Sequence, residues 1–137
     1  MINEESVMAV VICNNKILTI HEIVYGVLKV SLPKGHLEKG ETYMECAIRE
    51  TFEETNIILN RSQFIKMLNQ YHYEFINHDG EEVRKTITPL LFFIDKEGNP
   101  MPKEARMVKV EYLEIDAFLE ICSYENVKEV IKEVKNI

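Results

Sequence analysis

The stretch "LPKGHLEKGETYMECAIRETFEETNI", residues 32 to 57, places nine Glu, Lys and Arg side chains around two glycines. Gly35 and Gly40 interrupt the pattern and indicate a loop, and residues from about Thr42 to Thr55 then follow the period of a helix. Four residues recur at the spacing of one helix face: Met44, Ala47, Ile48 and Thr51. The stretch therefore predicts a charged loop that leads into a helix with one packing face.

Three glutamates adjoin this packing face. Glu50, Glu53 and Glu54 are three and four residues apart, so their carboxylates share one side of the helix. Like charges at this spacing destabilise an isolated helix by about 0.2–0.5 kcal/mol per pair. Arg49 offsets part of that cost, since it lies four residues from both Glu45 and Glu53. A solvated acidic face is the ordinary interpretation, and a site for Mg²⁺ or Mn²⁺, which prefer oxygen ligands, is the alternative.

The residues before the helix favour the metal site. Seven positions have the spacing of the Nudix box, G-x5-E-x7-R-E-U-x-E-E-x-G-U with U aliphatic: Gly35, Glu41, Arg49, Glu50, Glu53, Glu54 and Ile57. Thr51 replaces an aliphatic residue and still offers a methyl group to the core. Asn56 replaces the second glycine and tolerates the left-handed conformation that follows a helix. The stretch thus resembles the Nudix hydrolases.

This resemblance implies a role for each matching residue. The implied ligands of Mg²⁺ or Mn²⁺ are Glu50, Glu53 and Glu54, with the Gly35 carbonyl as a further ligand. Glu53 or Glu41 would activate the attacking water. Arg49 would orient the glutamates. The implied reaction is hydrolysis of a nucleoside diphosphate linked to another group. Cations suit this chemistry because they neutralise the diphosphate, polarise its P–O bond and lower the pKa of water.

Residues outside the box bear on the substrate. The Pro-Lys-Gly-His loop resembles that of the diadenosine tetraphosphate hydrolases, and Lys34 and His36 would then reach phosphates. Tyr73 lies where that subgroup stacks a tyrosine on a base, although alternating aromatic residues are also typical of a buried sheet face. Lys85 lies where the subgroup has a phosphate-facing lysine, and an exposed sheet edge is its alternative.

The sequence leaves open which late glutamate joins the site, and it departs from the family at one valine. Glu104 and Glu111 both lie where many family members carry a further catalytic or metal-binding glutamate, and their spacing does not single out one of them. Val30 occupies a position where relatives often have tryptophan. Because the chain departs from its relatives here, the resemblance does not predict a specific base pocket at Val30.

The predicted elements around the box alternate between strands and helices. Apolar runs and turn signals predict strands over residues 6–13, 16–23, 27–32, 64–76, 83–94 and 108–113. Two helical stretches follow, and the second has an apolar stripe at Val127, Val130, Ile131 and Val134. We therefore expect a mixed α/β class with helices against a mixed sheet. The resemblance makes this a Nudix-like α/β/α sandwich, with residues 1–137 as a single domain.

Composition limits the classes of function. The net charge of −7 disfavours a nucleic-acid polymer as partner, because phosphate backbones need a basic face. No window approaches about 18 consecutive apolar residues, and the first residues carry acids, so we expect a cytoplasmic protein without a membrane partner. The three cysteines show no pairing motif and are expected as free thiols in the core.

The leading hypothesis is a Mg²⁺-dependent hydrolase that converts diadenosine tetraphosphate to ATP and AMP. One alternative is a hydrolase of oxidised or noncognate nucleoside triphosphates. Another, from a different class, is a sensor that binds a nucleotide without cleaving it, although such relatives usually lack box glutamates that this chain retains. The resemblance is compatible with a monomer or a homodimer.

Overall fold

The computed structural model describes residues 1–136. Its strands are β1 (Ile2–Cys13), β2 (Lys16–Val24), β3 (Val27–Ser31), β4 (Lys34–His36), β5 (Phe64–Met67), β6 (Tyr71–Ile76), β7 (Glu82–Ile94) and β8 (Met107–Glu114). Its helices are α1 (Tyr43–Thr55), the 3₁₀ turn η1 (Arg61–Gln63), α2 (Ile115–Ile121) and α3 (Glu125–Lys135). The predicted helix of the charged stretch is therefore confirmed almost to the residue, with Thr42 as its N-cap.

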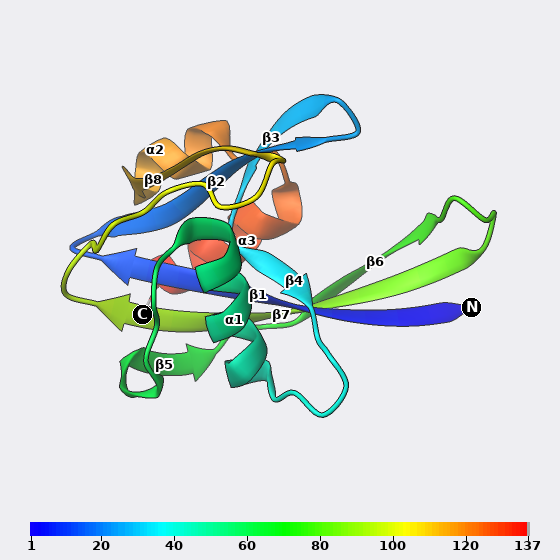
Figure 1. Cartoon of the computed structure of the whole chain (residues 1–137), viewed down its shortest axis with the longest axis horizontal. Coiled ribbons are helices and arrows are strands. Elements are labelled where there is room, and N and C mark those ends of the chain that lie inside the picture. The colour runs from blue at the N-terminus through cyan, green and yellow to red at the C-terminus, as the bar shows by residue number, and fades with distance from the viewer. Residues whose placement is uncertain (137) are drawn as a thin grey trace.

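One sheet organises the fold (Figure 1). Its main path is β3-β2-β1-β7-β5, with β4 beside β1, β6 beside β7 and β8 beside β2. The long strands β1 and β7 run parallel, and every other pairing is antiparallel. The sheet is mixed, as the sequence predicted.

Strand β1 is apolar on both faces because helices cover both sides of the sheet. Val7, Ala9 and Val11 pack in the cluster that includes Cys46 and Ala47 of α1. The intervening Met8 and Val10 pack in a second cluster with Phe118 of α2 and the apolar stripe of α3. A strand buried on both faces reads as a continuous apolar run. The mixed α/β fold with layers of helix, sheet and helix is thus confirmed.

Two predicted boundaries were wrong. The segment 64–76 is not one strand, because β5 pairs with residues 90–92 of β7 whereas β6 pairs with residues 82–87. At the break Leu68 turns into the core and its N–H donates to the Pro89 carbonyl at 2.9 Å. A 13-residue strand is long enough for two partners end to end, which local periodicity cannot show. The predicted loop after Pro33 also contains β4, paired with residues 6–8 of β1.

Two further expectations can be compared with the described residues. Cys13, Cys46 and Cys122 are free and buried, as predicted. No helix within residues 1–136 is long and apolar enough to cross a membrane.

Candidate active site

Helix α1 has a side-chain cap at its N-terminal end and a left-handed residue at its C-terminal end. The Thr42 hydroxyl accepts a hydrogen bond from the Glu45 backbone N–H, and the Glu45 carboxylate accepts one from the Thr42 N–H at 2.8 Å. This capping box satisfies two otherwise unpaired donors and engages Glu45 away from Arg49. At the other end Asn56 has a φ of 69°, the left-handed conformation expected there.

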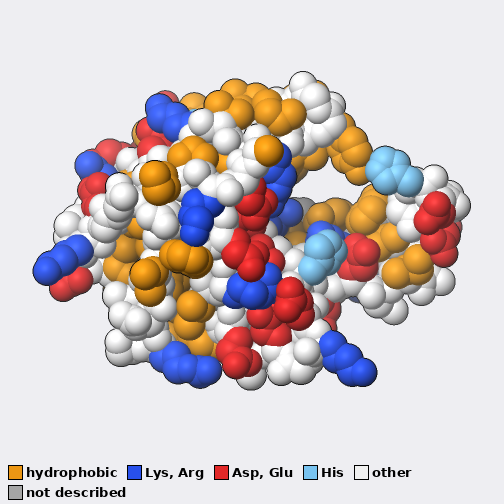
Figure 2. Space-filling model, in the orientation of Figure 1, with side chains coloured by type: hydrophobic (Ala, Val, Ile, Leu, Met, Phe, Trp, Pro, Cys, Tyr) orange, Lys and Arg blue, Asp and Glu red, His pale blue; other side chains and the backbone are white. Residues whose placement is uncertain are grey.

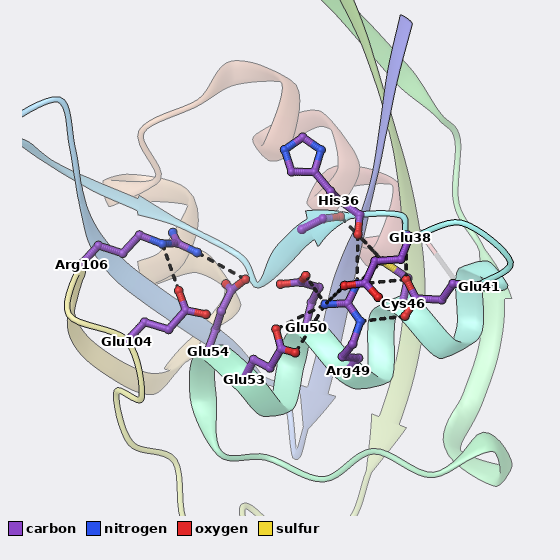
Figure 3. Close-up of polar contacts among 11 residues, drawn as sticks. His36, Glu38, Glu41, Cys46, Arg49, Glu50, Glu53, Glu54, Glu104 and Arg106 are labelled. Carbon is purple, nitrogen blue, oxygen red and sulfur yellow. Dashed lines mark hydrogen bonds and ion pairs between the residues drawn. The ribbon is translucent and has the colours of Figure 1, made fainter.

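Arg49 is the hub of the acidic cluster (Figure 3). Its Nε and Nη2 donate to the two oxygens of Glu41 at 2.7 and 2.9 Å. Its Nη1 donates to Glu50 at 2.6 Å and lies 3.3 Å from Glu53. Nη2 also donates to the backbone carbonyl of His36 at 3.0 Å. One guanidinium therefore ties the loop to the helix and orients two of the carboxylates.

Glu41 and Glu53 differ in how firmly they are held. The paired hydrogen bonds from Arg49 lower the pKa of Glu41 to about 2, and the Glu38 N–H strengthens the effect at 3.0 Å. The same contacts raise the pKa of Arg49 above its ordinary value. The Glu53 side chain is 45% exposed and has only the looser contact with Arg49. Glu41 is thus a weak base in a fixed position, whereas Glu53 is free to meet a ligand.

Glu54 is buried rather than solvated, so the ordinary interpretation of an acidic face is wrong for this residue. Its side chain is 1% exposed. Among residues 1–136 no group donates a hydrogen bond to either carboxylate oxygen, and the nearest cation is Arg106, with Nη2 at 3.6 Å. Burial raises the pKa of Glu54 well above its ordinary value, and the neighbouring Glu50 adds to the rise. A buried carboxylate without donors is a costly arrangement that a bound cation would relieve.

Gly35 brings the backbone of β4 against the same cluster. A Cβ at this position would lie 2.0 Å from the Cδ of Glu50, so a larger residue here would displace the Glu50 carboxylate. The donors here are carboxylate and carbonyl oxygens, the type that Mg²⁺ and Mn²⁺ prefer. No three acidic, His or Cys side chains within residues 1–136 converge as a ready ligand set, because Glu50 and Glu53 turn toward Arg49. The residues fit a divalent cation provided these carboxylates rotate away from the guanidinium.

The structure separates the two late glutamates. Glu104 accepts a hydrogen bond from the Nε of Arg106 at 3.1 Å, beside Glu54 (Figure 3). Glu111 lies on β8 and pairs with His21 at 2.7 Å instead. Only Glu104 therefore belongs to the acidic cluster. Arg106 itself was missed by sequence reasoning.

A cavity of about 830 Å³ collects most of the predicted substrate residues. Lys34, Tyr73 and Lys85 all line it, although they come from β4, β6 and β7. Its other lining residues are mainly aromatic or polar: Glu22, Val24, Tyr25, Tyr71, Phe75, Ile76, Asn77, His78, Tyr124, Asn126 and Val127. Burial lowers the pKa of Lys85, and nearby Lys34 contributes. Lys85 is thus half-buried on a central strand and not at a sheet edge.

Of the two predicted substrate residues Tyr73 and His36, only Tyr73 lines the cavity. The Tyr73 ring is on the cavity side of β6, next to Phe75 with a centroid distance of 6.0 Å, and the residue is 37% exposed. It is therefore not a core residue. His36 is exposed and does not line the cavity, and its imidazole points away from the acidic cluster in Figure 3. Only its backbone carbonyl takes part in the network, through Arg49.

The cavity and the acidic cluster are neighbours. Lys34 lines the cavity, and the next residue, Gly35, lies against Glu50. Glu22 also lines the cavity and pairs with Arg106, which reaches Glu54. Figure 2 shows the acidic side chains gathered in the middle of one face, beside a hollow. A nucleotide in the cavity could therefore place its phosphates at the acids.

The family follows from a match over nearly the whole chain. A family model described as NUDIX domain matches residues 3–134. The chain belongs to the NUDIX domain family. Its box departs from the family pattern at Thr51 and Asn56, and the structure accounts for both. Thr51 is buried in α1 as an apolar side chain would be, and the Asn56 amide donates to the Asn99 carbonyl at 3.1 Å, tying the loop before β8 to the helix.

Curated NUDIX relatives match part of the chain. The phosphatase NudJ of Escherichia coli (strain K12) is 40% identical over 62 residues, which are 45% of this chain and 40% of NudJ. A protein of Mycobacterium tuberculosis (strain CDC 1551 / Oshkosh) named MutT4 is 47% identical over 62 residues, 45% of this chain and 23% of MutT4. The matched segment spans less than half the length of either relative.

Solved structures share the fold over at least 97% of the chain. The Escherichia coli dihydroneopterin triphosphate pyrophosphohydrolase aligns with a TM-score of 0.75 at 17% identity, covering 100% of both chains. A Caenorhabditis elegans Ap4A hydrolase aligns with a TM-score of 0.74 at 17% identity, covering 97% of this chain and 96% of that one. The NUDIX domain of Shewanella oneidensis NrtR, complexed with ADP ribose, has a TM-score of 0.80 at 13% identity, covering 99% and 88%. These neighbours differ in their ligands and support the fold alone.

Proposed function

We propose that this protein is a divalent-cation-dependent hydrolase that cleaves a diphosphate bond in a nucleoside diphosphate linked to another group, and that its substrate is a dinucleoside polyphosphate. The observation that carries the proposal is the junction at Lys34 and Gly35. Lys34 lines the aromatic cavity, and Gly35 lies against the carboxylate of Glu50. A nucleoside in the cavity thereby has its phosphates beside the acids.

The proposed cation ligands are Glu50, Glu53 and Glu54, with the Gly35 carbonyl as a further ligand. The burial of Glu54 without a hydrogen-bond donor supports this set. When bound, Mg²⁺ or Mn²⁺ would neutralise the diphosphate and make water a better nucleophile. Arg49 would stay bonded to both oxygens of Glu41, while Glu50 would exchange its bond to Arg49 for the cation.

Of the two candidate bases, the contacts favour Glu53. A general base must reach the proton that it abstracts and must hold it long enough to catalyse. Both Glu41 oxygens are occupied by Arg49, which lowers the pKa of Glu41 to about 2. Glu53 is 45% exposed and has no bond shorter than 3.3 Å. We assign water activation to Glu53 and the positioning of Arg49 to Glu41.

The cavity supports a nucleotide with additional phosphates. Its volume of about 830 Å³ is in the range of sites that enclose small molecules. Tyr73 and its aromatic neighbours offer flat surfaces on which a base can stack. Lys34 and Lys85 share the cavity and would neutralise phosphates between the base and the acids. A diadenosine tetraphosphate would be cleaved to ATP and AMP.

The test is product analysis with a substrate panel in Mg²⁺. The panel contains diadenosine tetraphosphate, oxidised dGTP and ADP-ribose, each incubated with the wild type, with Glu53→Gln and with Glu129→Gln. Glu129 is an exposed residue of α3 that pairs with Lys132, so its variant controls for loss of one surface carboxylate. Preferential conversion of diadenosine tetraphosphate to ATP and AMP, lost by about 100-fold or more in Glu53→Gln only, is the expected result.

Other outcomes discriminate between the alternatives. Preferential cleavage of oxidised dGTP would support the triphosphate hydrolase and reject the dinucleotide substrate. Tight nucleotide binding without turnover in Mg²⁺ or Mn²⁺ would support a sensor and reject the hydrolase. Equal activity of Glu53→Gln and the wild type would reject the role of Glu53.

A further inference from the structure

Arg106 lies among three carboxylates from three parts of the chain. Its Nη1 pairs with Glu22 of β2, its Nε with Glu104 at 3.1 Å, and its Nη2 approaches Glu54 of α1 to 3.6 Å (Figure 3). Within the described 136 residues, no other Lys or Arg lies within 4.0 Å of the carboxylate of Glu22 or Glu54. Arg106 is therefore the cation nearest to both buried acids among the residues that the structure describes.

The two acids are buried, whereas the arginine is not. The side chains of Glu22 and Glu54 are 6% and 1% exposed, and that of Arg106 is 44% exposed. The pairing of β2 with β8 shifts its register between His21 and Glu22, and such irregularities re-aim side chains near functional sites. Burying a carboxylate without a partner is strongly unfavourable. The fold thus places two buried carboxyl groups beside one partly exposed arginine.

Backbone contacts hold Arg106 at this place. Its carbonyl accepts a hydrogen bond from the Ile23 N–H at 2.9 Å, which anchors the loop to β2. The same loop is tied to α1 by the Met101 N–H, which donates to the Thr55 carbonyl at 2.9 Å. These two backbone hydrogen bonds fix the loop to β2 and to α1, and the loop thereby places the Arg106 guanidinium beside the acids. Its own contact with Glu54, at 3.6 Å, is longer than a hydrogen bond and easily broken.

We propose that Arg106 is a positioning residue that serves as the internal counter-cation of Glu22 and Glu54, and that a divalent cation held by Glu54 competes with it for that carboxylate. This inference rests on the proposed cation site. The close pair with Glu22 keeps the side chain in place, while the looser contact yields Glu54 to the incoming cation. Arg106 thereby stabilises the protein before the cation binds and lowers the affinity of the site for the cation.

The experiment measures cation binding without any nucleotide. Mn²⁺ affinity is determined by EPR on the full chain, and the melting temperature is measured in EDTA and in Mg²⁺. The variants are Arg106→Gln, Arg106→Lys and the double variant Glu22→Gln/Arg106→Gln, in which the buried charge left at Glu22 is also removed. Arg61→Gln, at an exposed position of η1, is the matched control for loss of a surface arginine.

Arg106→Gln is expected to melt at a lower temperature in EDTA, to gain more from Mg²⁺ than the wild type, and to bind Mn²⁺ on the order of tenfold tighter, because a positive charge beside the ligand is gone. Arg106→Lys should return toward the wild type. The double variant should regain stability in EDTA and keep the tighter Mn²⁺ binding, which a purely structural role would not produce.

Unchanged or weaker Mn²⁺ binding in the folded double variant overturns the competition between Arg106 and the cation. A wild type that does not bind Mn²⁺ overturns the cation site and this inference together. Cation-dependent turnover combined with identical Mn²⁺ affinities overturns the inference and leaves the proposed function standing.

Discussion

Gly35→Ala should disable the site while leaving the fold in place. The added Cβ would lie 2.0 Å from the Glu50 Cδ, whereas ordinary contact begins at 3.4 Å. The Glu50 carboxylate must therefore move by about 1.4 Å, the difference between these distances. Because Glu50 is held by Arg49 at 2.6 Å, the shift breaks a charge-assisted hydrogen bond.

The magnitudes follow from that displacement. Loss of a hydrogen bond between charged groups costs about 1.5–3 kcal/mol, which lowers the melting temperature by about 3–12 °C in a domain of this size. Misplacing a ligand by about 1 Å is expected to lower kcat/KM by about 100-fold. Urea unfolding, Mn²⁺ binding and hydrolysis of diadenosine tetraphosphate measure the three effects.

Gly40→Ala is the matched control. A Cβ at Gly40 meets nothing within 4 Å, but the residue has a φ of +80°, so alanine there costs about 1–2 kcal/mol of backbone strain. The two variants should lose similar stability, and only Gly35→Ala should lose cation binding and activity. Wild-type Mn²⁺ affinity in Gly35→Ala would refute the close approach of β4 to Glu50.

Three further predictions test separate parts of the structure. Tyr73→Ala should raise the KM for diadenosine tetraphosphate by about 5-fold to 100-fold, the value of one stacked base, and leave inorganic tetraphosphate unaffected; equal changes for both would assign Tyr73 a structural role. Arg49 lowers the pKa of Glu41 from 4.5 to about 2. The ion pair of Glu41 with Arg49 therefore contributes fully to the free energy of unfolding above pH 4.5, and this contribution is lost as the pH falls toward 2. The stability difference between the wild type and Glu41→Gln, measured by urea unfolding in EDTA, should therefore shrink over that interval, and a difference independent of pH would count against the pairing with Arg49. Asn56→Gly should change the free energy of unfolding by less than about 1 kcal/mol, since glycine accepts the left-handed conformation, whereas Asn56→Ala should cost about 2 kcal/mol by losing both that tolerance and one hydrogen bond. Equal stability of the glycine and alanine variants would show that the left-handed φ is not costly there.

Residue spacing in the sequence predicted only some of the contacts in the acidic cluster. The helical period predicted the contact between Arg49 and Glu53, four residues apart. It did not predict the shorter bonds from Arg49 to the adjacent Glu50 and to Glu41 of the loop. It did not predict that Glu45 would be engaged in a capping box, because a side chain near a helix start has two competing local partners.

The burial of Glu54 could not be predicted from the sequence, for a different reason. The same period that placed Glu54 beside Glu50 could not say whether that side of the helix meets water or protein. The answer depends on the loop that carries Glu104 and Arg106, which packs there through contacts with the end of α1. Such contacts join residues more than 40 positions apart, and no local pattern records them.

What the sequence determined by itself is therefore the element that holds the site: a loop, a capped helix and the order of its charged side chains, all fixed by interactions within a few residues. The tertiary structure alone decided which distant residues complete it. Strand pairing brought Lys34, Tyr73 and Lys85 into one cavity, selected Glu104 over Glu111, and set Arg106 between Glu22 and Glu54. The physical reason is that register and loop closure minimise the free energy of the whole packed chain, whereas helix periodicity and capping are properties of adjacent residues.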